Sequence, residues 1–523
     1  MNYRLYLIAL FVCSGIILSF IIEPESSDAE RVQADYLQNA REFHRQVSVL
    51  KNTLASANKN QIQQQFILTR SAYKKIEIFV EYFFPFYAGK LNGPPIPFFE
   101  ESEPDMGEQQ PMGMQLIESY IFPNILLSKK NDLLFQVKEL DRYANELPEV
   151  NSSFAFDDSN TWDAIMEELY RVTATGITGF DSQVAANSLA ENREVLKGMQ
   201  TIISFYKKSF KDQGLDYEQF DNLLTKAEEY LSINTNFNDL DREVFIRSYL
   251  NPITKMVALY KTSKGYIDNP SSRFYSAIRK NNTLFARVAF NPYRFLDDYN
   301  SNAYKVFLGK KLFFDNRLSS GNNRSCASCH NPSLAFTDGL AKSKAIDGHT
   351  ILPRNAPTIW NAALQRNLFY DSRSRTLEDQ VMQVLNNANE MHGSADTSAK
   401  NILLLDEYKS LYTQAFPLAK SGDAAINICN AIASYERTLV SLNSKFDRHM
   451  RGEDILNKNE INGFNLFMGK AKCGTCHFMP LFSGAKPPRY YFIESEVIGV
   501  PASANKTKPT LDKDSGRFLI TKQ

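Results

Sequence analysis

The chain contains Cys326-Ala327-Ser328-Cys329-His330 and, further on, Cys473-Gly474-Thr475-Cys476-His477. In both segments two cysteines are separated by two residues and followed directly by a histidine. Two thiols at this spacing can add to the two vinyl groups of one haem, and the adjacent histidine can then ligate its iron. The two segments therefore predict two covalently bound c-type haems. Cys326, Cys329, Cys473 and Cys476 would hold the porphyrins, and His330 and His477 would be axial ligands.

Two other kinds of site use the same cysteine spacing, a zinc ribbon and a redox dithiol. The two cysteine pairs of a zinc ribbon normally lie closer in sequence than these two. Neither alternative explains a histidine directly after both pairs. The pattern therefore favours haem over both.

Length and composition limit the number of domains and exclude some classes of protein. At roughly 100–200 residues per domain, a chain of 523 residues holds about three units and is not a single small module. Lys plus Arg and Asp plus Glu are both 59, so no global basic field exists that would hold nucleic acid. Six cysteines are too few for a disulfide scaffold in a chain of this length.

The N-terminus predicts export. Arg4 precedes an apolar run over residues 5–22, and four acidic residues follow it. The run suits either a cleaved signal peptide or an uncleaved membrane anchor, so residues 1–30 are assigned to one of these. Cys13 follows Val12, where a lipoprotein signal has a small residue, so we interpret Cys13 as apolar filler. Both alternatives place the body of the chain in the periplasm or otherwise outside the cytoplasmic membrane, where c-type haem is attached.

The spacing of apolar residues predicts an all-α fold. Between about residues 35 and 272 apolar residues recur three or four apart, and no sustained period-two alternation appears. We expect a helical bundle over residues 31–290 and two tandem cytochrome c-like domains, over 291–448 and 449–523. Cys429 falls on an apolar helical face and is expected to be a buried core thiol.

Beyond the two haem motifs, the sequence resembles the bacterial di-haem cytochrome c peroxidase family. The resemblance covers residues from about 300 to 518 and rests on LGKKLFFDNRLSSGNNRSCASCHNPSLAFTDGLA, RNAPT, FYDSR, LEDQ, NNANEM, AIASYERTL and GFNLFMGKAKCGTCH. It implies that hydrogen peroxide is reduced at the first haem. A small donor protein, such as a cytochrome c or a cupredoxin, would supply electrons through the second haem. It also implies that Glu390 moves a proton between the peroxide oxygens while Gln380 hydrogen-bonds the substrate.

The resemblance suggests four further site residues. The family usually has Trp in the FYDSR segment, so Tyr370 and the nearby Trp360 are the candidates for an electron relay. His349 lies in the loop from which some family members bring a reversible ligand to the resting peroxide haem. Asn355 resembles a position that gives an oxygen to a calcium ion between the haems. His392 and His449 are expected at the surface.

The stretch over residues 60–125 resembles the imelysin-like helical domain. That family often has a Gly-x-His-x-x-Glu motif proposed to touch metal, and here the motif is Gly113-Met114-Gln115-Leu116-Ile117-Glu118. Because Gln replaces the histidine, a docking or structural role is favoured over a metal site.

The segment after His477 is short for a complete cytochrome c domain. Met479 is too close to His477 to reach the opposite face of a haem, and Tyr490 and Tyr491 are the other candidate ligands. We therefore expect the second cytochrome domain to be incomplete at its C-terminus. Two other functions stay open: a non-enzymatic di-haem electron carrier, and a di-haem oxidase that matures another protein, as the methylamine dehydrogenase maturation enzymes do.

Overall fold

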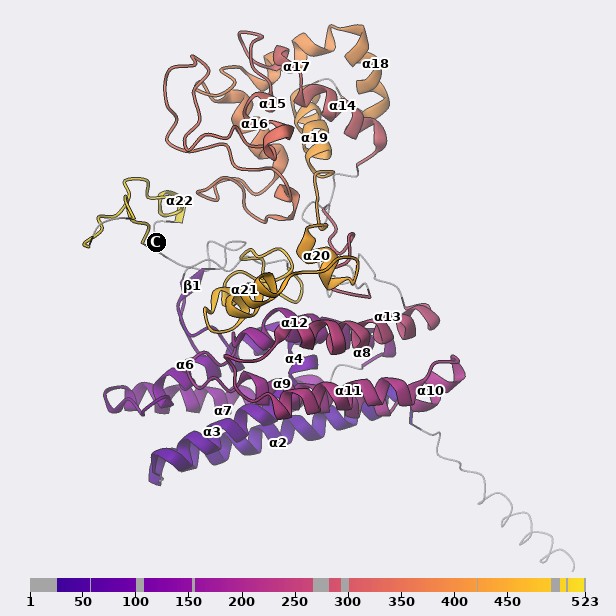
Figure 1. The fold of residues 1–523 in the computed structure, drawn as a ribbon, viewed down its shortest axis with the longest axis vertical. Helices are drawn as coiled ribbons and strands as arrows, with labels where there is room; N and C mark the ends of the chain where they lie inside the picture. Colours follow the sequence, from indigo (N-terminus) through magenta and orange to yellow (C-terminus); the bar gives the residue numbers. More distant parts are fainter. Residues whose placement is uncertain are drawn as a thin grey trace, which may run out of the picture.

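The computed structural model describes residues 26–56, 58–99, 108–152, 156–266, 282–292, 301–420, 422–490, 499–504 and 507–521. Within these ranges the secondary-structure elements are all helices except for one antiparallel pair of two-residue strands, β1 (Phe98–Phe99) and β2 (Glu108–Gln109), and loops connect them. The predicted all-α fold is confirmed (Figure 1). The predicted signal or anchor, and with it Cys13, lies outside the described residues. Among the described helices none has both the length and the apolar character needed to cross a membrane.

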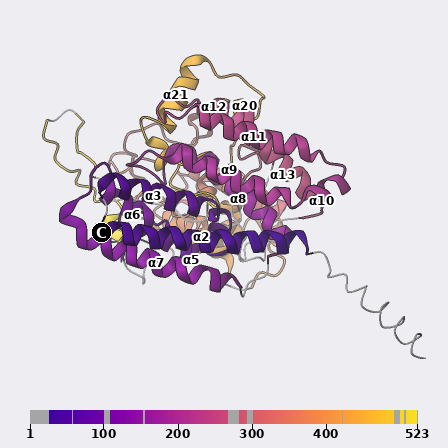
Figure 2. The ribbon, with the colours of Figure 1, turned by 90° about the horizontal axis from the view of Figure 1, so that it is seen from below.

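The N-terminal half forms a bundle in which the long helices lie side by side (Figures 1 and 2). Its helices are α2 (Asp28–Ser56), α3 (Lys59–Lys74), α4 (Glu77–Phe83), α5 (Pro85–Leu91), α6 (Gly113–Ile121), η2 (Leu127–Lys129), α7 (Lys130–Ser152), α8 (Asp158–Ala174), η3 (Gly176–Thr178), α9 (Ser188–Ser204), α10 (Lys207–Asp212), α11 (Tyr217–Ile233), α12 (Arg242–Phe245), the π-helix η4 (Ile246–Leu250) and α13 (Asn251–Ser263).

Helix α2 shows why the sequence pattern predicts this bundle. Its apolar residues recur three or four apart and are at most 1% exposed; they are Val32, Tyr36, Ala40, Phe43, Val47 and Leu50. At 3.6 residues per turn this spacing places them on one face of the helix. The next helix, α3, begins at a capping box in which Asn58 and Gln61 exchange hydrogen bonds with each other's backbone.

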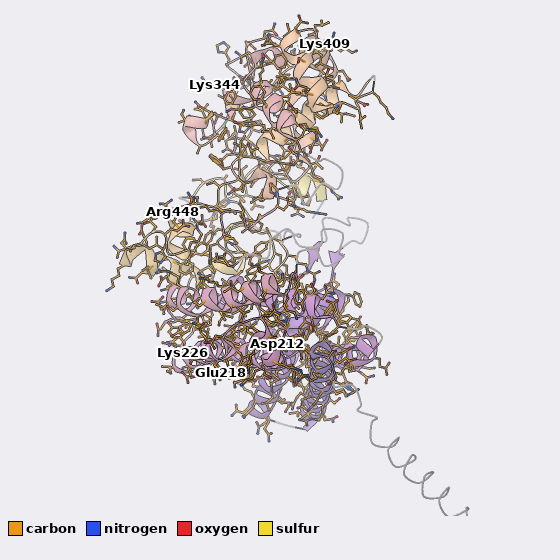
Figure 3. All side chains as sticks on the ribbon, turned by 90° about the vertical axis from the view of Figure 1, so that its right-hand side faces the viewer. Asp212, Glu218, Lys226, Lys344, Lys409 and Arg448 are labelled. Atoms are coloured by element: carbon orange, nitrogen blue, oxygen red, sulfur yellow. The ribbon has the colours of Figure 1, made fainter. Side chains whose placement is uncertain are left out.

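The C-terminal half contains shorter helices. They are α14 (Ala303–Phe313), η5 (Asn316–Leu318), α15 (Cys326–Cys329), η6 (Pro332–Leu334), η7 (Ala362–Leu364), α16 (Leu377–Asn386), α17 (Ala395–Leu403), α18 (Asp406–Ala415), α19 (Ala424–Glu436), α20 (Lys445–Met450), α21 (Lys458–Met468), η8 (Cys473–Thr475) and α22 (Phe518–Thr521). Figure 1 shows them in two places. Helices α14 to α19 form an upper unit, whereas α20 and α21 lie between that unit and the bundle. The side view in Figure 3 shows the same order, with Lys344 and Lys409 in the upper unit, Arg448 in the middle and Lys226 in the bundle.

The apolar cores follow this division. The upper unit has its own core, which includes Leu308, Leu312 and Ile432. Residues around the second haem motif instead belong to the bundle's core, where Met450, Met468, Met479 and Tyr490 are at most 2% exposed. The two predicted cytochrome segments therefore differ in kind, because the second shares a single core with the bundle.

Helices α14 and α19 of the upper unit cross in close contact at Gly309. A Cβ atom at this glycine would lie 1.8 Å from the carbonyl oxygen of Ala431. Only a residue without a side chain permits the two backbones to approach this closely. Leu312 and Phe313, three and four residues further on, are fully buried beneath the crossing.

The same Gly-x-x-Leu-Phe pattern recurs before the second motif, in α21. Here it is Gly463, Leu466 and Phe467, but a Cβ atom at Gly463 would meet nothing within 4 Å. Leu466 is 52% exposed, whereas its counterpart Leu312 is fully buried. The face of α21 that corresponds to the crossing in the upper unit is therefore open.

This contrast yields a matched pair of substitutions. Gly309→Ala should destabilise the upper unit by about 1–3 kcal/mol, because the added methyl group overpacks the crossing. Gly463→Ala should be neutral or stabilise by up to about 1 kcal/mol, because alanine favours the helix and meets no neighbour. Calorimetric unfolding of both variants checks this, and equal effects at the two glycines would contradict the assigned crossing.

Candidate functional site

The first haem motif occupies one helical turn. Ser325 caps α15, and its backbone N–H donates to Ser328 Oγ at 3.1 Å. Residues three apart on a helix are neighbours on its surface, so Cys326 and Cys329 lie on the same side of this turn. The His330 backbone N–H then donates to the Cys326 carbonyl at 2.9 Å, which places the histidine directly after the two thiols.

A tight turn after the motif orients the His330 ring. His330 Nδ1 lies 3.0 Å from the Phe336 carbonyl oxygen. A carbonyl only accepts, so the proton is on Nδ1 and Nε2 is the ring nitrogen that can ligate a metal. The turn has left-handed backbone at Phe336, with φ of 59°. It is held by Thr358, whose hydroxyl donates to the Ala335 carbonyl at 2.6 Å, and by the Trp360 ring, which lies 5.3 Å from that of Phe336.

The second motif repeats this geometry. The His477 backbone N–H donates to the Cys473 carbonyl at 3.0 Å, and His477 Nδ1 lies 3.2 Å from the carbonyl oxygen of Phe482. Phe482 has φ of 51°, matching Phe336. Both turns close with an isolated antiparallel bridge, Asn331 with Thr337 and Phe478 with Ser483. Two segments far apart in sequence thus have a similar local fold around their histidines, although the second turn is one residue shorter.

The residues present fit two c-type haems. All four motif cysteines are free thiols, as thioether formation requires, and each is at least partly exposed. Burial lowers the pKa of His330, partly opposed by the hydrogen bonds that the ring makes to the Phe336 and Pro357 carbonyls, and so favours the neutral ring that can bind iron. The described residues contain no group of three or more His, Cys, Asp and Glu side chains that could hold a free metal ion.

The predicted acid–base residue, Glu390, lies beside the first motif. It is half-buried in the turn after α16, where Asn387 Nδ2 donates to its Oε1 at 3.0 Å. Burial raises the pKa of the Cys329 thiol, and the negative charges of Asp338 and Glu390 add to this shift. Burial also raises the pKa of Glu390, and the positive charges of Arg373 and Arg324 partly oppose this. Gln380, also half-buried, lies on the preceding helix α16.

His349 lies on an exposed hairpin tip, at which Asp347 Oδ1 accepts from the His349 and Thr350 backbone N–H groups. The hairpin is tied to the turn that carries Glu390, because the Ile346 N–H donates to the Asn389 carbonyl at 2.9 Å. Its role as a reversible ligand stays a prediction. Asn355 is exposed, and its role as a calcium ligand likewise stays a prediction.

Tyr370 lies beside a cluster of ion pairs around Arg354 that the sequence did not predict. Arg354 donates to Asp514 at 2.8 Å through both Nε and NH2 and to Asp371 at 2.7 Å through NH1. The Arg354 guanidinium lies 5.1 Å from the Tyr370 ring centre, and Gly516 lies on the same ring. Asp514 follows the second motif in sequence yet binds the upper unit, a pairing that no local pattern signals. Tyr370 and Trp360, 62% and 39% exposed, are the relay candidates that reach the surface.

One predicted surface histidine is buried. His449 is 2% exposed; its Nδ1 accepts from the Leu456 N–H and its Nε2 donates to Glu243 at 2.7 Å. The prediction was wrong because a carboxylate from the bundle, remote in sequence, satisfies the ring. His392 is exposed and Cys429 is buried, as expected. Tyr490, a candidate second-haem ligand, is buried with its hydroxyl bound to the Met479 carbonyl, and Tyr491 lies outside the described residues.

Two attachment motifs with the same histidine-orienting turn define a c-type cytochrome with two haem sites. Residues 303–455 match the family model for di-haem cytochrome c peroxidase. The cytochrome region of this chain therefore belongs to that family, which implies two c-type haems.

The chain is also similar to individual proteins. The methylamine utilization protein MauG of Methylorubrum extorquens is 38% identical over 174 residues, 33% of this chain and 49% of that protein. The cytochrome c551 peroxidase of Pseudomonas aeruginosa is 35% identical over 216 residues, 41% of this chain and 59% of that protein. The chain thus spans about half the length of these curated relatives. A crystal structure of a MauG-like protein associated with microbial copper homeostasis is 30% identical, with a TM-score of 0.38, over 43% of this chain and 67% of that one.

The electrostatics of Glu390 yield a prediction about its titration. Arg373→Gln should raise the pKa of Glu390 further, because a positive charge that opposes the effect of burial is removed. Arg373→Lys keeps the charge and should change it less. Infrared difference titration against Glu390→Gln would identify the carboxyl band; a pKa that falls in Arg373→Gln would contradict the assigned surroundings.

Proposed function

We propose that this chain is an exported di-haem peroxidase that reduces hydrogen peroxide to water with electrons from a small donor protein. In the overall reaction the O–O bond breaks, and two electrons and two protons convert one peroxide into two water molecules. The proposal is carried by the position of Glu390, a half-buried carboxyl group beside Cys329 in the first motif whose pKa burial raises.

The chain divides into residues that hold the cofactors and residues that act on substrate. Cys326, Cys329 and His330 would hold the first haem, and Cys473, Cys476 and His477 the second. When bound, the haems supply one-electron chemistry and an iron that can bind peroxide.

Glu390 would hold and move the proton. A general acid must carry a proton at the operating pH, and burial shifts this carboxyl in that direction. The charges of Arg373 and Arg324 partly oppose this shift, and Arg324 also fixes the adjacent hairpin by donating to the Ala345 carbonyl at 2.8 Å. Gln380, on the helix that leads into this turn, would orient the substrate by hydrogen bonding.

Electrons would enter at the second motif, where Cys476 and His477 are exposed to solvent. A small protein such as a cytochrome c or a cupredoxin can approach an exposed haem edge. Tyr370 would serve as a relay on the surface of the upper unit, where Arg354 and Gly516 hold its ring. Tyrosine loses its proton on oxidation, so this relay would be coupled to proton release.

A second candidate function is oxidation of a residue on another protein, as expected of a di-haem maturation oxidase. The chain is also similar to the methylamine utilization protein MauG. The exposure of Tyr370, 62%, favours this candidate, because an aromatic ring at the surface can exchange electrons with an external protein. The donor discriminates the two: the peroxidase takes electrons from a reduced small protein, whereas the maturation enzyme takes them from a protein substrate that is permanently modified.

Glu390→Gln tests the catalytic assignment. The variant should retain both haems and lose about 10²–10⁴-fold in peroxide turnover, the usual contribution of a general acid–base group. Asp379→Asn is the matched control, because Asp379 is an exposed carboxylate on α16. Steady-state turnover with a reduced cytochrome donor measures both, and a Glu390→Gln variant as active as the wild type would refute the assignment.

Replacing both Cys473 and Cys476 by Ala tests the division of labour. One covalent haem should be lost, and donor-driven turnover should fall far more than peroxide binding at the first site. The intact mass counts haems, and a spectral titration with peroxide measures binding. An equal loss of donor-driven turnover and of peroxide binding would show that the two haem sites do not act separately.

A further inference from the structure

The loop between α8 and α9, residues 176–187, connects the interior of the bundle to the second haem motif. We call it the anchor loop. One side of it is fixed by a buried polar network, and the other side packs on residues 472–486. Neither side belongs to the proposed peroxide site.

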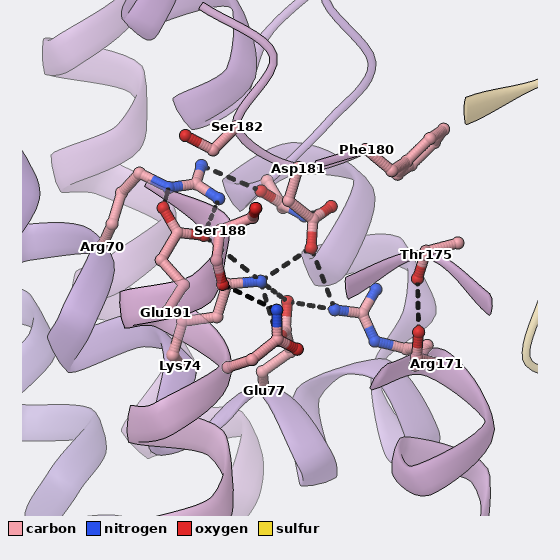
Figure 4. A network of polar contacts seen from close by, with 12 residues as sticks. Arg70, Lys74, Glu77, Arg171, Thr175, Phe180, Asp181, Ser182, Ser188 and Glu191 are labelled. Carbon is pink, nitrogen blue, oxygen red and sulfur yellow. Dashed lines mark hydrogen bonds and ion pairs between the residues drawn. The ribbon is translucent and has the colours of Figure 1, made fainter. Parts of the chain in front are cut away.

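On the inner side, Asp181 is 3% exposed and accepts from four side chains that come from four parts of the bundle. These donors are Lys74 of α3 at 2.7 Å, Asn92 after α5 at 2.9 Å, Gln115 of α6 at 3.2 Å and Arg171 of α8 at 3.2 Å. Figure 4 labels two of these donors, Lys74 and Arg171. Burial alone would raise the pKa of Asp181, but the charges of Lys74 and Arg171 outweigh it and hold the pKa well below its usual range. The carboxylate is therefore ionised and its position fixed.

Helix α6 holds the same loop a second time. Glu118 Oε1 accepts from the backbone N–H groups of Val184 at 2.8 Å and Ala185 at 2.9 Å. Gln115 and Glu118 belong to the Gly-x-Gln-x-x-Glu motif. Its Gly113 has φ of 79°, and a Cβ atom there would lie 2.8 Å from the Leu91 carbonyl oxygen, so glycine is required at this position. Through these hydrogen bonds the motif fixes the anchor loop against helix α6.

On the outer side, the anchor loop packs on the second motif. The Phe180 ring lies edge-on to that of Phe478, the residue after His477, at 5.5 Å. Lys472, directly before Cys473, donates to the Gln183 carbonyl at 2.9 Å. A Cβ atom at Gly474, inside the motif, would lie 3.2 Å from the methyl group of Thr178. Contacts therefore occur before, within and after the motif.

We propose that Asp181 and Glu118 are positioning residues for the second haem: they fix the anchor loop, and the anchor loop fixes the segment from Lys472 to Phe478 against the bundle. This inference rests on the proposed function, since it takes Cys473, Cys476 and His477 to hold a haem. It gives the bundle a specific task, namely to support the electron-entry site. The reduction potential of a haem depends on burial, hydrogen bonding and ligand orientation, so a displaced anchor loop should change it.

The experiment uses the full chain with both haems attached. Intact mass first counts the covalent haems in the wild type, and a spectroelectrochemical titration then gives the potential of each haem. Asp181→Asn removes one of the two buried carboxylates that Lys74 and Arg171 share, and leaves them with Glu77. It should shift the redox equilibrium of the second haem at least tenfold, about 59 mV for one electron, and leave the first haem unchanged.

Glu191→Gln is the matched control. Glu191 is 1% exposed and pairs with Arg70 at 2.6 Å in the same network. Its other contacts are long, 3.8 Å to Lys74 and 3.5 Å to Asn187, and the variant keeps Asp181 and all four of its donors. It should cost bundle stability without moving either potential. A second variant, Phe180→Ala, leaves the network intact and removes the ring's contacts with Phe478 and with Lys486 of the same segment. It should therefore move the potential of the second haem even if Asp181→Asn fails to fold.

Three results would overturn the inference. The first is an unchanged reduction potential of the second haem in Asp181→Asn, and the second is an equal shift of that potential in Glu191→Gln. The third is an unchanged potential of the second haem in Phe180→Ala. A wild-type chain that carries only one covalent haem would overturn the proposed function, and this inference with it, at the mass measurement that comes first.

Discussion

Apolar packing between the bundle and the residues around the second haem motif is the constraint on which the rest of the arrangement depends. Met450, Met468 and Met479 are each at most 1% exposed in the core they share with the bundle. Fully burying a methionine side chain is worth roughly 1.5–3 kcal/mol, so these three alone contribute about 5–9 kcal/mol before the entropy of ordering is subtracted. Polar contacts fix the register of this packing: Asn465 Oδ1 accepts from the Arg242 backbone N–H at 2.9 Å, and Arg489 pairs with Glu167 at 3.1 Å.

The two haem units are thereby unequal. The upper unit has its own core, its own helix crossing at Gly309 and the half-buried Glu390 next to its motif. The second unit repeats the histidine-orienting turn but presents an open helix face at Gly463 and takes its core from the bundle. Such an inequality suits a division between one haem that meets substrate and another that passes electrons. The pairing of Arg354 with Asp514 brings the C-terminal segment back to the upper unit and so links the two.

The features that could be predicted from the sequence are those that depend on residues close together in the chain. Three- and four-residue spacing predicted the helices that the structure shows. The cysteine–histidine motifs predict the attachment sites. The sequence could not predict pairings that depend on the tertiary fold. His449 reads as a surface residue until Glu243 is brought to it from the bundle, and Asp514 has no local signal that marks it as a partner of Arg354. The left-handed turns at Phe336 and Phe482 were also missed, because a bulky residue rarely adopts positive φ. The Gly-x-x-Leu-Phe repeat was available from the sequence, but its meaning depends on whether another helix crosses it.

Hydrogen exchange in increasing denaturant, followed by peptide mass analysis, tests most directly the claim that the two haem motifs belong to two different cooperative units. Segments with a common core open together, whereas separate cores open at different free energies. Peptides from residues 449–490 should lose protection together with those from the bundle, residues 28–263, and separately from those of residues 303–439. If residues 449–490 instead open together with residues 303–439, the shared core with the bundle does not govern the fold, and the account is contradicted.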